Sequence, residues 1–80
     1  MSIRKIILKK LFRHRYIGGR HTEIRNAIKG FPPPLLKEVK EEIKNLIKED
    51  YLLSKMSTGE IHISLNPRKL NEIKDEISDG

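Results

Sequence analysis

The first segment of the chain alternates apolar and charged residues with helical spacing. Its apolar positions lie three or four residues apart or are adjacent, at Ile3, Ile7, Leu8, Leu11 and Phe12. This pattern predicts an amphipathic helix over about residues 2–14, with Ser2 as its N-cap. Tyr16 and Ile17 follow before two glycines break the pattern, so we expect a very short extended segment there.

A short second helix is predicted within the stretch HTEIRNAIKG, residues 21–30. Its apolar positions share one face: Ile24, Ala27 and Ile28. Thr22 is expected to cap its free amide groups, and Gly30 suits the position after the last turn. Three prolines come after Phe31. Because proline is tolerated in the first turn of a helix, they end this helix and begin the next.

The third predicted helix, over about residues 34–49, sorts its side chains into three sectors when drawn with about 100° between residues. The apolar sector contains Leu36, Val39, Ile43, Leu46 and Ile47. The basic sector contains Lys37, Lys40, Lys44 and Lys48, and the acidic sector contains Glu38, Glu41, Glu42 and Glu49, with Asn45 between them. A row of lysines about one turn apart repels itself unless an anion lies against it. The sorting therefore favours an anionic partner such as duplex DNA over a helix that is merely solvated.

Strand periodicity occurs in the stretch YLLSKMSTGEIHISLN, residues 51–66, where apolar and polar residues alternate after Gly59. The residues before Glu60 supply turn chemistry, so we predict a hairpin. Two registers are open. A two-residue loop of Thr58 and Gly59 pairs Met56 with Ile61, whereas a three-residue loop pairs Leu53 with Ile63.

Asn66 and Pro67 are predicted to open a last helix, as its cap and its first residue. Its narrow apolar stripe consists of Leu70, Ile73 and Ile77. This stripe packs either on the first helix or against a second copy of the chain, as the seam of a homodimer. The predicted order is helix, short strand, helix, helix, hairpin, helix. We therefore expect an α+β fold, mostly α, in a single domain over residues 1–80.

The net charge of +6 is concentrated at the start of the chain. Seven of the 17 lysine and arginine residues precede Glu23, which is the first acidic residue. Nucleic acid is the common partner of such a basic segment and an anionic membrane is the rarer one. A lysine-rich surface that is only solvated is the alternative.

Several other functions lack the residues that they need. The chain contains no cysteine, which excludes disulfides, thiol catalysis and cysteine-bound zinc. His14, His21 and His62 have no metal-ligand spacing, and no nucleotide-binding or catalytic motif is present, so we expect no metal, no cofactor and no enzyme. No apolar run approaches the roughly 20 residues of a membrane span, and the charged start does not resemble a signal peptide. A cytoplasmic protein without a membrane partner is expected.

The stretch HTEIRNAIKGFPPPLLKEVKEEIKNLIKEDYLLSKMSTGEIHISLNP resembles the winged helix-turn-helix domain. The run LIKEDYLL is typical of the end of the third helix and the start of the wing, although many members have a glycine where this chain has Asp50. GGRHTEI, KGFP and SLNP are similar to small, stand-alone archaeal members. The resemblance implies a three-helix core, a two-stranded β-wing and a C-terminal helix. It also implies a DNA-binding protein, such as a transcriptional regulator or a chromatin-associated factor.

In winged helices that bind DNA, the third helix enters the major groove, the wing touches the adjacent backbone, and the start of the second helix meets a phosphate. The resemblance therefore implies groove contacts by Lys37, Lys40, Lys44 and Asn45, in a row that Lys48 extends. It implies phosphate contacts by Arg20, His21 and the amides near Thr22. It implies wing contacts by Lys55, Ser57, Thr58 and His62, which faces outward in both registers. Arg4, Lys5, Lys9 and Lys10 would lie behind the third helix, and whether they serve DNA or a protein partner stays open.

Two other partners are compatible with the same fold. A protein-interaction subunit of a larger assembly, without nucleic-acid contact, would use the acidic sector of the third helix for a basic partner. RNA is less favoured, because the chain has only two phenylalanines and two tyrosines for base stacking. Double-stranded DNA is therefore the partner that we expect.

Overall fold

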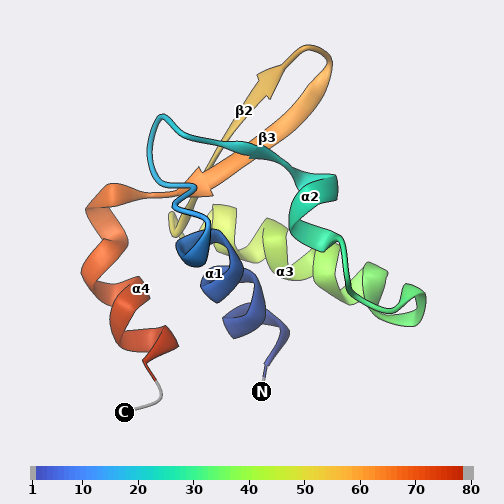
Figure 1. Cartoon of the computed structure of the whole chain (residues 1–80), viewed down its shortest axis with the longest axis horizontal. Coiled ribbons are helices and arrows are strands. Elements are labelled where there is room, and N and C mark those ends of the chain that lie inside the picture. The colour runs from blue at the N-terminus through green and yellow to red at the C-terminus, as the bar shows by residue number, and fades with distance from the viewer. Residues whose placement is uncertain (1, 79–80) are drawn as a thin grey trace.

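Four helices and three strands make up the computed structural model, which describes residues 2–78. The helices are α1 (Ile3–Arg13), α2 (Ile24–Ile28), α3 (Leu36–Lys48) and α4 (Leu70–Ile77), and the strands are β1 (Thr22–Glu23), β2 (Leu52–Ser57) and β3 (Glu60–Leu65). The predicted α+β class, mostly helical, is confirmed (Figure 1). No helix in this part of the chain is both long enough and apolar enough to cross a bilayer.

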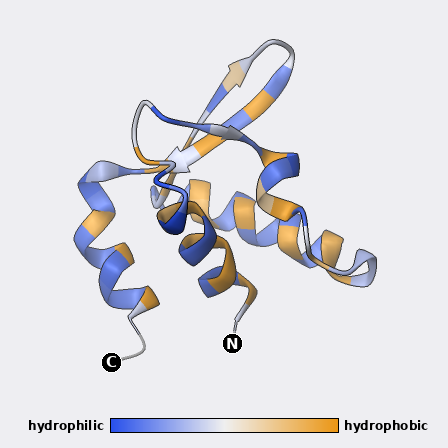
Figure 2. Cartoon of the chain, viewed as in Figure 1, coloured by the Kyte–Doolittle hydropathy of each residue, from blue (hydrophilic) through white to orange (hydrophobic). Residues whose placement is uncertain are grey.

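The helices enclose a small core beneath the sheet. α1 packs against α2, α3 and α4, and the hairpin of β2 and β3 projects away from the helices (Figure 1). Figure 2 shows that apolar segments line the inward sides of α1 and α3 and continue onto the hairpin. The buried apolar residues come from all four helices and from the sheet: Ile7, Leu8, Leu11, Ala27, Val39, Ile43, Leu46, Leu52, Ile63, Leu65 and Ile73.

The apolar stripe of α4 is used within the chain. Ile73 is fully buried, and Leu70 and Ile77 are partly buried against the same core. α4 contacts α1, which is the first of the two arrangements that the sequence left open. Ile73 is therefore already covered without a second copy of the chain, and a homodimer through this stripe stays a prediction.

The hairpin has the register of the two-residue loop. Met56 pairs with Ile61 and Lys55 pairs with His62, while Thr58 and Gly59 form the turn with φ angles of 49° and 78°. Two successive residues with positive φ match a type I′ turn, whose twist suits the adjoining strands. The three-residue loop is not formed.

The place expected for the short strand is wrong, because β1 lies at Thr22–Glu23 and not near Tyr16 and Ile17. β1 adds a third strand to the hairpin, in the order β1-β3-β2. Thr22 pairs with Ile63 and is buried, and its hydroxyl oxygen accepts a hydrogen bond from Asn26 Nδ2 at 3.1 Å. The prediction that Thr22 caps α2 is therefore also wrong. Glu23 takes the cap position, and its side chain makes no capping bond. Pairing with the open edge of β3 satisfies backbone groups that a side-chain cap would leave free.

The segment between α1 and β1 is held against the end of β3. Ile17 forms an isolated bridge to Leu65, which is all that is found of the short extended segment expected there. The Gly18 amide donates to the Leu65 carbonyl at 2.9 Å, and the Leu65 amide donates to the Tyr16 carbonyl at 2.8 Å. Gly18 has a φ of 61°, and a Cβ atom there would lie 3.2 Å from Pro67 Cγ. The positive φ angle and the close approach of Pro67 therefore each favour glycine at this position.

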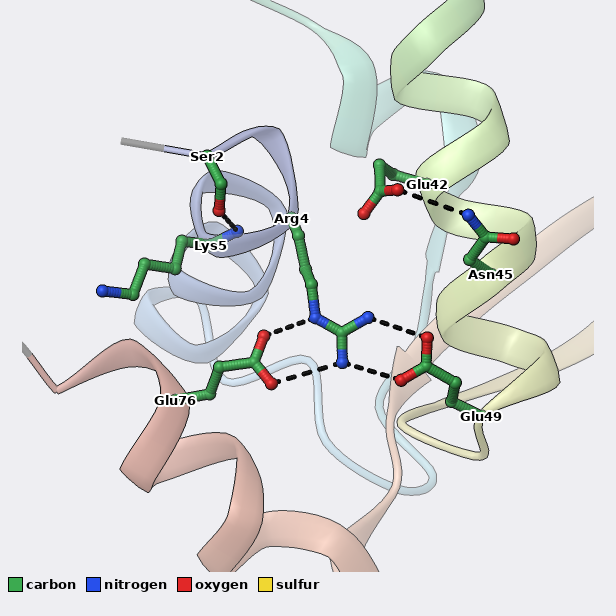
Figure 3. Close-up of polar contacts among 7 residues, drawn as sticks. All are labelled: Ser2, Arg4, Lys5, Glu42, Asn45, Glu49 and Glu76. Atoms are coloured by element: carbon green, nitrogen blue, oxygen red, sulfur yellow. Dashed lines mark hydrogen bonds and ion pairs between the residues drawn. The ribbon is translucent and has the colours of Figure 1, made fainter.

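Two predicted capping side chains form the expected hydrogen bonds, although Asn66 caps the 3-10 turn Pro67–Lys69 that leads into α4 and not α4 itself. The Ser2 hydroxyl accepts from the Lys5 amide at 3.1 Å at the start of α1 (Figure 3). Asn66 Oδ1 accepts from the Arg68 amide at 3.1 Å, while its Nδ2 donates to the Asp50 carbonyl at 2.8 Å. Asn66 thus connects the end of α3 to the turn that leads into α4.

Two residues after the end of α1 and of α3, the chain has a residue in the left-handed conformation that is not glycine. Arg15 has a φ of 59° and Asp50 has a φ of 65°. After α3, the amides of Asp50 and Tyr51 donate to carbonyls of the last turn at 3.0 and 2.9 Å. This is the Schellman pattern, in which glycine is the usual residue at the left-handed position.

Arg4 connects three helical regions through one guanidinium group (Figure 3). Its two terminal nitrogens donate to the carboxylate of Glu49 at 2.9 Å each, and Nε and Nη2 donate to the carboxylate of Glu76. Hydrogen bonds to Glu76 and Glu49 raise the pKa of Arg4. The cluster joins α1 to the end of α3 and to α4, so this arginine has a structural role.

Candidate nucleic-acid interface

The lysine sector of α3 lies on the surface of the protein. Lys37, Lys40, Lys44 and Lys48 are all exposed. Lys44 Nζ lies 3.9 Å from Glu41 on the same helix, a contact at the limit of an ion pair between two largely exposed side chains. Among residues 2–78 the other three lysines form no ion pair. This sector is therefore a row of cations that the protein itself barely neutralises.

Two glutamates of the acidic sector, Glu42 and Glu49, face a different part of the molecule. Glu49 is turned toward α1 and α4, where Arg4 holds it. Asn45 Nδ2 donates to Glu42 at 3.3 Å, so its amide is engaged with the acidic sector (Figure 3). Asn45 was predicted to contact the DNA groove together with the lysines, and in this arrangement its amide would first have to leave Glu42.

The lysine sector borders a groove between α2, α3 and the hairpin. Lys40 and Lys44 line this groove, whose volume is about 320 Å³. The other residues that line it are Ile24, Ile43, Ile47, Ser54 and Ile61. The inner face of the hairpin thus lies next to Lys40 and Lys44 of α3.

Three other predicted site residues lie on the opposite face of the sheet. His21, Lys55 and His62 border a second cavity of about 330 Å³, which Gly18 and Gly19 also line. Successive side chains of a strand point to opposite faces. Because Ile61 lies beside the lysines of α3, its neighbour His62 must lie on the outer face.

His21 and His62 contact each other on this outer face. Their Nδ1 atoms are 2.8 Å apart, and their rings meet edge to face with centroids 4.7 Å apart. His62 points away from the core as predicted, but it is covered, and its Nε2 atom is buried without a hydrogen-bond partner. Burial lowers the pKa of His21, and the nearby Lys55 and His62 lower it further. The neutral form of His21 is therefore favoured.

The remaining predicted contacts are dispersed. The Arg20 guanidinium lies over the Tyr16 ring at 5.5 Å and is exposed. Thr58 is exposed in the hairpin turn, and Ser57 beside it is partly buried. Thr22 is buried within β1, so its side chain is not accessible to a phosphate. The predicted site thus divides into the lysine sector, the outer face of the sheet and the hairpin turn.

Two basic residues of α1 are structural. Arg4 holds Glu49 and Glu76, as described above. Lys10 Nζ donates to the carbonyl of Lys29 at 2.7 Å and to that of Ala27 at 3.4 Å, and so it caps the end of α2. Burial lowers the pKa of Lys10, and the charge of Lys29 lowers it further. Fewer positive charges of the first segment are therefore available to a partner than its sequence suggests.

Sequence reasoning missed the apolar residues beside the lysines. Met56 is 67% exposed and Ile61 is 45% exposed, and the two are cross-strand partners on the inner face of the hairpin. The two-residue register already paired these residues. Their exposure could not be foreseen, because it depends on how far the hairpin extends beyond α3.

No family model matches the sequence, and neither the curated proteins nor the solved structures include a significant match. The function must therefore be inferred from the geometry and charge of the chain itself.

Proposed function

We propose that this chain is a winged-helix protein that binds double-stranded DNA through the lysine sector of α3. In this proposal α2 and α3 form the helix-turn-helix, and β2 and β3 form the wing. A transcriptional regulator or a chromatin-associated factor in the cytoplasm would use such a domain. The observation that carries the proposal is the exposed row of Lys37, Lys40, Lys44 and Lys48, of which Lys40 and Lys44 line the groove beside the hairpin.

Charge and spacing support contact with a phosphate backbone. Lysines about one turn apart on an exposed helix face repel one another, and phosphates relieve this repulsion with release of counterions from the DNA. Lysine is a point charge rather than a planar fork, so it contacts backbone oxygens with less base selectivity than arginine does. Affinity that depends strongly on salt and weakly on base sequence is expected.

The positions of Glu42 and Glu49 reduce one objection to this proposal but do not remove it, because Glu38 and Glu41 are exposed on α3. Glutamates on the same helix would repel phosphates if they faced the DNA. Glu49 is instead turned to the opposite side, where Arg4 neutralises it. Glu42 is partly buried there and accepts from Asn45. The lysine sector can thus approach a duplex without bringing these two carboxylates to it.

The remaining predicted contacts have smaller parts in the proposal. Lys55, Ser57 and Thr58 lie on the hairpin, whose turn would meet the backbone beside the groove. Arg20 and His21 lie toward the outer face of the sheet, so they would contact a second stretch of backbone or none. The side chain of Thr22 is excluded by its burial.

Fluorescence anisotropy with a labelled random-sequence duplex tests the proposal. The double variant Lys40→Gln, Lys44→Gln is compared with Lys69→Gln, Lys74→Gln, which removes the same charge from the segment around α4. We expect the first variant to lose about tenfold or more in affinity and to show a shallower salt dependence between about 50 and 200 mM salt, and the second to change far less.

Two results would contradict the proposal. One is an equal loss of affinity in both variants, since only total charge would then matter. The other is no binding by the native chain at low salt, where electrostatic contacts with DNA are strongest.

A further inference from the structure

DNA binding accounts for the lysines of α3 but not for the apolar surface next to them. Met56 and Ile61 expose 67% and 45% of their area on the inner face of the hairpin. Phosphates gain nothing from such side chains. Exposed apolar surface that continues into a groove is characteristic of a binding site for another molecule.

The groove combines this apolar surface with a cationic border. Ile24, Ile43, Ile47 and Ile61 line it, and Lys40 and Lys44 lie beside them. Its volume of about 320 Å³ is at the low end for ligand sites, which suits a few anchoring side chains. An occupant that complements both parts must present apolar side chains in a row, with carboxylates alongside.

An amphipathic helix with acidic flanks has this arrangement. Its apolar residues recur at every third or fourth position, which is the pattern by which helices enter hydrophobic grooves. Glutamate or aspartate on its flanks would reach Lys40 and Lys44. Binding of such a helix would therefore depend on the apolar residues of the groove as well as on the lysines, whereas DNA binding would depend on the lysines alone.

We propose that the groove between α2, α3 and the hairpin binds an acidic amphipathic helix of a partner protein. Lys40 and Lys44 contact its carboxylates, while Ile61 and Met56 cover its apolar side. Where the proposed DNA binding holds, the helix and the duplex compete for the same two lysines, and only this competition rests on the proposed function. The binding of the helix stands without it.

A second copy of the chain is a poorer occupant of this groove. Two copies facing each other here would bring their Lys40 and Lys44 side chains together, and each chain already carries a net charge of +6. Like charges in close contact oppose association. An acidic partner reverses the sign of that interaction.

A labelled peptide of about 14 residues tests this inference, with leucine at each third or fourth position and glutamate or aspartate between them. One control peptide has the same composition in an order without an apolar stripe. A second control keeps the leucines and carries glutamine in place of the acidic residues. We expect the first peptide to bind at least about tenfold more tightly than either control.

Variants of the hairpin separate its two faces. Met56→Ser and Ile61→Ser alter the inner face, while the matched control Leu53→Ser alters a side chain on the outer face that is 41% exposed. Because all three residues are exposed on the hairpin, each variant is expected to fold, which its thermal unfolding confirms or denies. We expect the inner-face variants to weaken peptide binding by about tenfold and the control to change it by less than about twofold.

Several results would overturn the inference. Equal binding of the striped and scrambled peptides would show a contact made by charge alone. An equal loss in Leu53→Ser would place the contact elsewhere. Self-association of the native chain that Ile61→Ser abolishes, measured by light scattering, would make a second copy the occupant.

Failure here is distinguishable from failure of the DNA proposal. Duplex binding without peptide binding leaves the DNA proposal intact and overturns the inference. Peptide binding without duplex binding supports the inference and contradicts the DNA proposal. When both bind, unlabelled peptide is expected to displace the labelled duplex, and its failure to do so would contradict a shared site.

Discussion

His21 and His62 hold the segment before β1 against the outer face of the sheet, with their Nδ1 atoms 2.8 Å apart. A hydrogen bond between two such atoms requires one to donate and the other to accept. When both rings are protonated, both Nδ1 atoms are donors and the bond is lost. The ammonium of Lys55 adds repulsion on the same side of the sheet.

Acid is therefore expected to destabilise the fold near the pKa of histidine. The folded chain lowers the pKa of His21 through burial, Lys55 and His62, so the unfolded chain binds the proton more tightly. The contribution of neutral His21 to the free energy of unfolding is fully present above about pH 6.5, the pKa of histidine in the unfolded chain. It is lost as the pH falls below that value. Thermal unfolding between about pH 8 and pH 5 should show a falling Tm.

The variant His21→Gln should lose most of this dependence, because it removes the group whose pKa is lowered. His14→Gln is the matched control, since His14 is exposed at the end of α1 and should leave the profile unchanged. A native profile that is flat across this range, or one that both variants alter equally, would show that the histidine pair does not control stability.

Replacing Arg4 is expected to lower the free energy of unfolding. Arg4→Gln removes the hydrogen bonds to Glu49 and Glu76, and it leaves two carboxylates near each other. Because Glu49 is half exposed, we expect a loss of about 1–2 kcal/mol rather than that of a buried pair. Urea denaturation measures it.

Arg13→Gln serves as the control for charge on the same helix, because Arg13 is exposed. It should change the free energy of unfolding by no more than about 0.5 kcal/mol. Arg4→Lys, which keeps the charge but loses the planar fork, should lie between the two. Equal effects of Arg4→Gln and Arg13→Gln would show that the Arg4 cluster adds nothing to stability.

Asp50→Gly is expected to stabilise the chain. Asp50 has a φ of 65° after α3, where glycine avoids the strain of a Cβ atom, and its charge lies unfavourably at the negative end of the helix dipole. The bond from Asn66 uses the Asp50 carbonyl and survives the change. We expect a gain of about 0.5–1 kcal/mol in urea denaturation, because relief of strain exceeds the extra entropy of the unfolded glycine.

Asp50→Asn separates the two causes of this gain, since asparagine removes the charge and tolerates the left-handed region better than most residues. An intermediate stability is expected for it. If Asp50→Gly proved less stable than the native chain, the aspartate would have to make a favourable contact that outweighs its strain.

Local patterns in the sequence predicted most of the elements. The spacing of Ile7 and Leu11 located α1, and the capping side chains of Ser2 and Asn66 were correctly identified. These features depend on residues that are close in the chain. β1 was missed, because its pairing with β3 joins positions about 40 residues apart, and a two-residue strand has no periodicity of its own.

The candidate site was harder to predict than the fold. The lysine sector of α3 follows from the geometry of a single helix, and it is exposed as expected. The positions of His21 and Lys55 depend on which face of the sheet each occupies, and this required the strand register. The role of Arg4 could not be inferred, since both of its partners lie on helices that the sequence does not place in space.

The Arg4 cluster also bears on the order in which the chain folds. Its contacts close loops of 45 and 72 residues, so they form late, after the chain between them has become ordered. Until α4 arrives, the part of α1 that it covers stays open to water and to other chains. A substitution in α4 should therefore raise the unfolding rate more than it lowers the folding rate, because contacts that form after the transition state act mainly on unfolding.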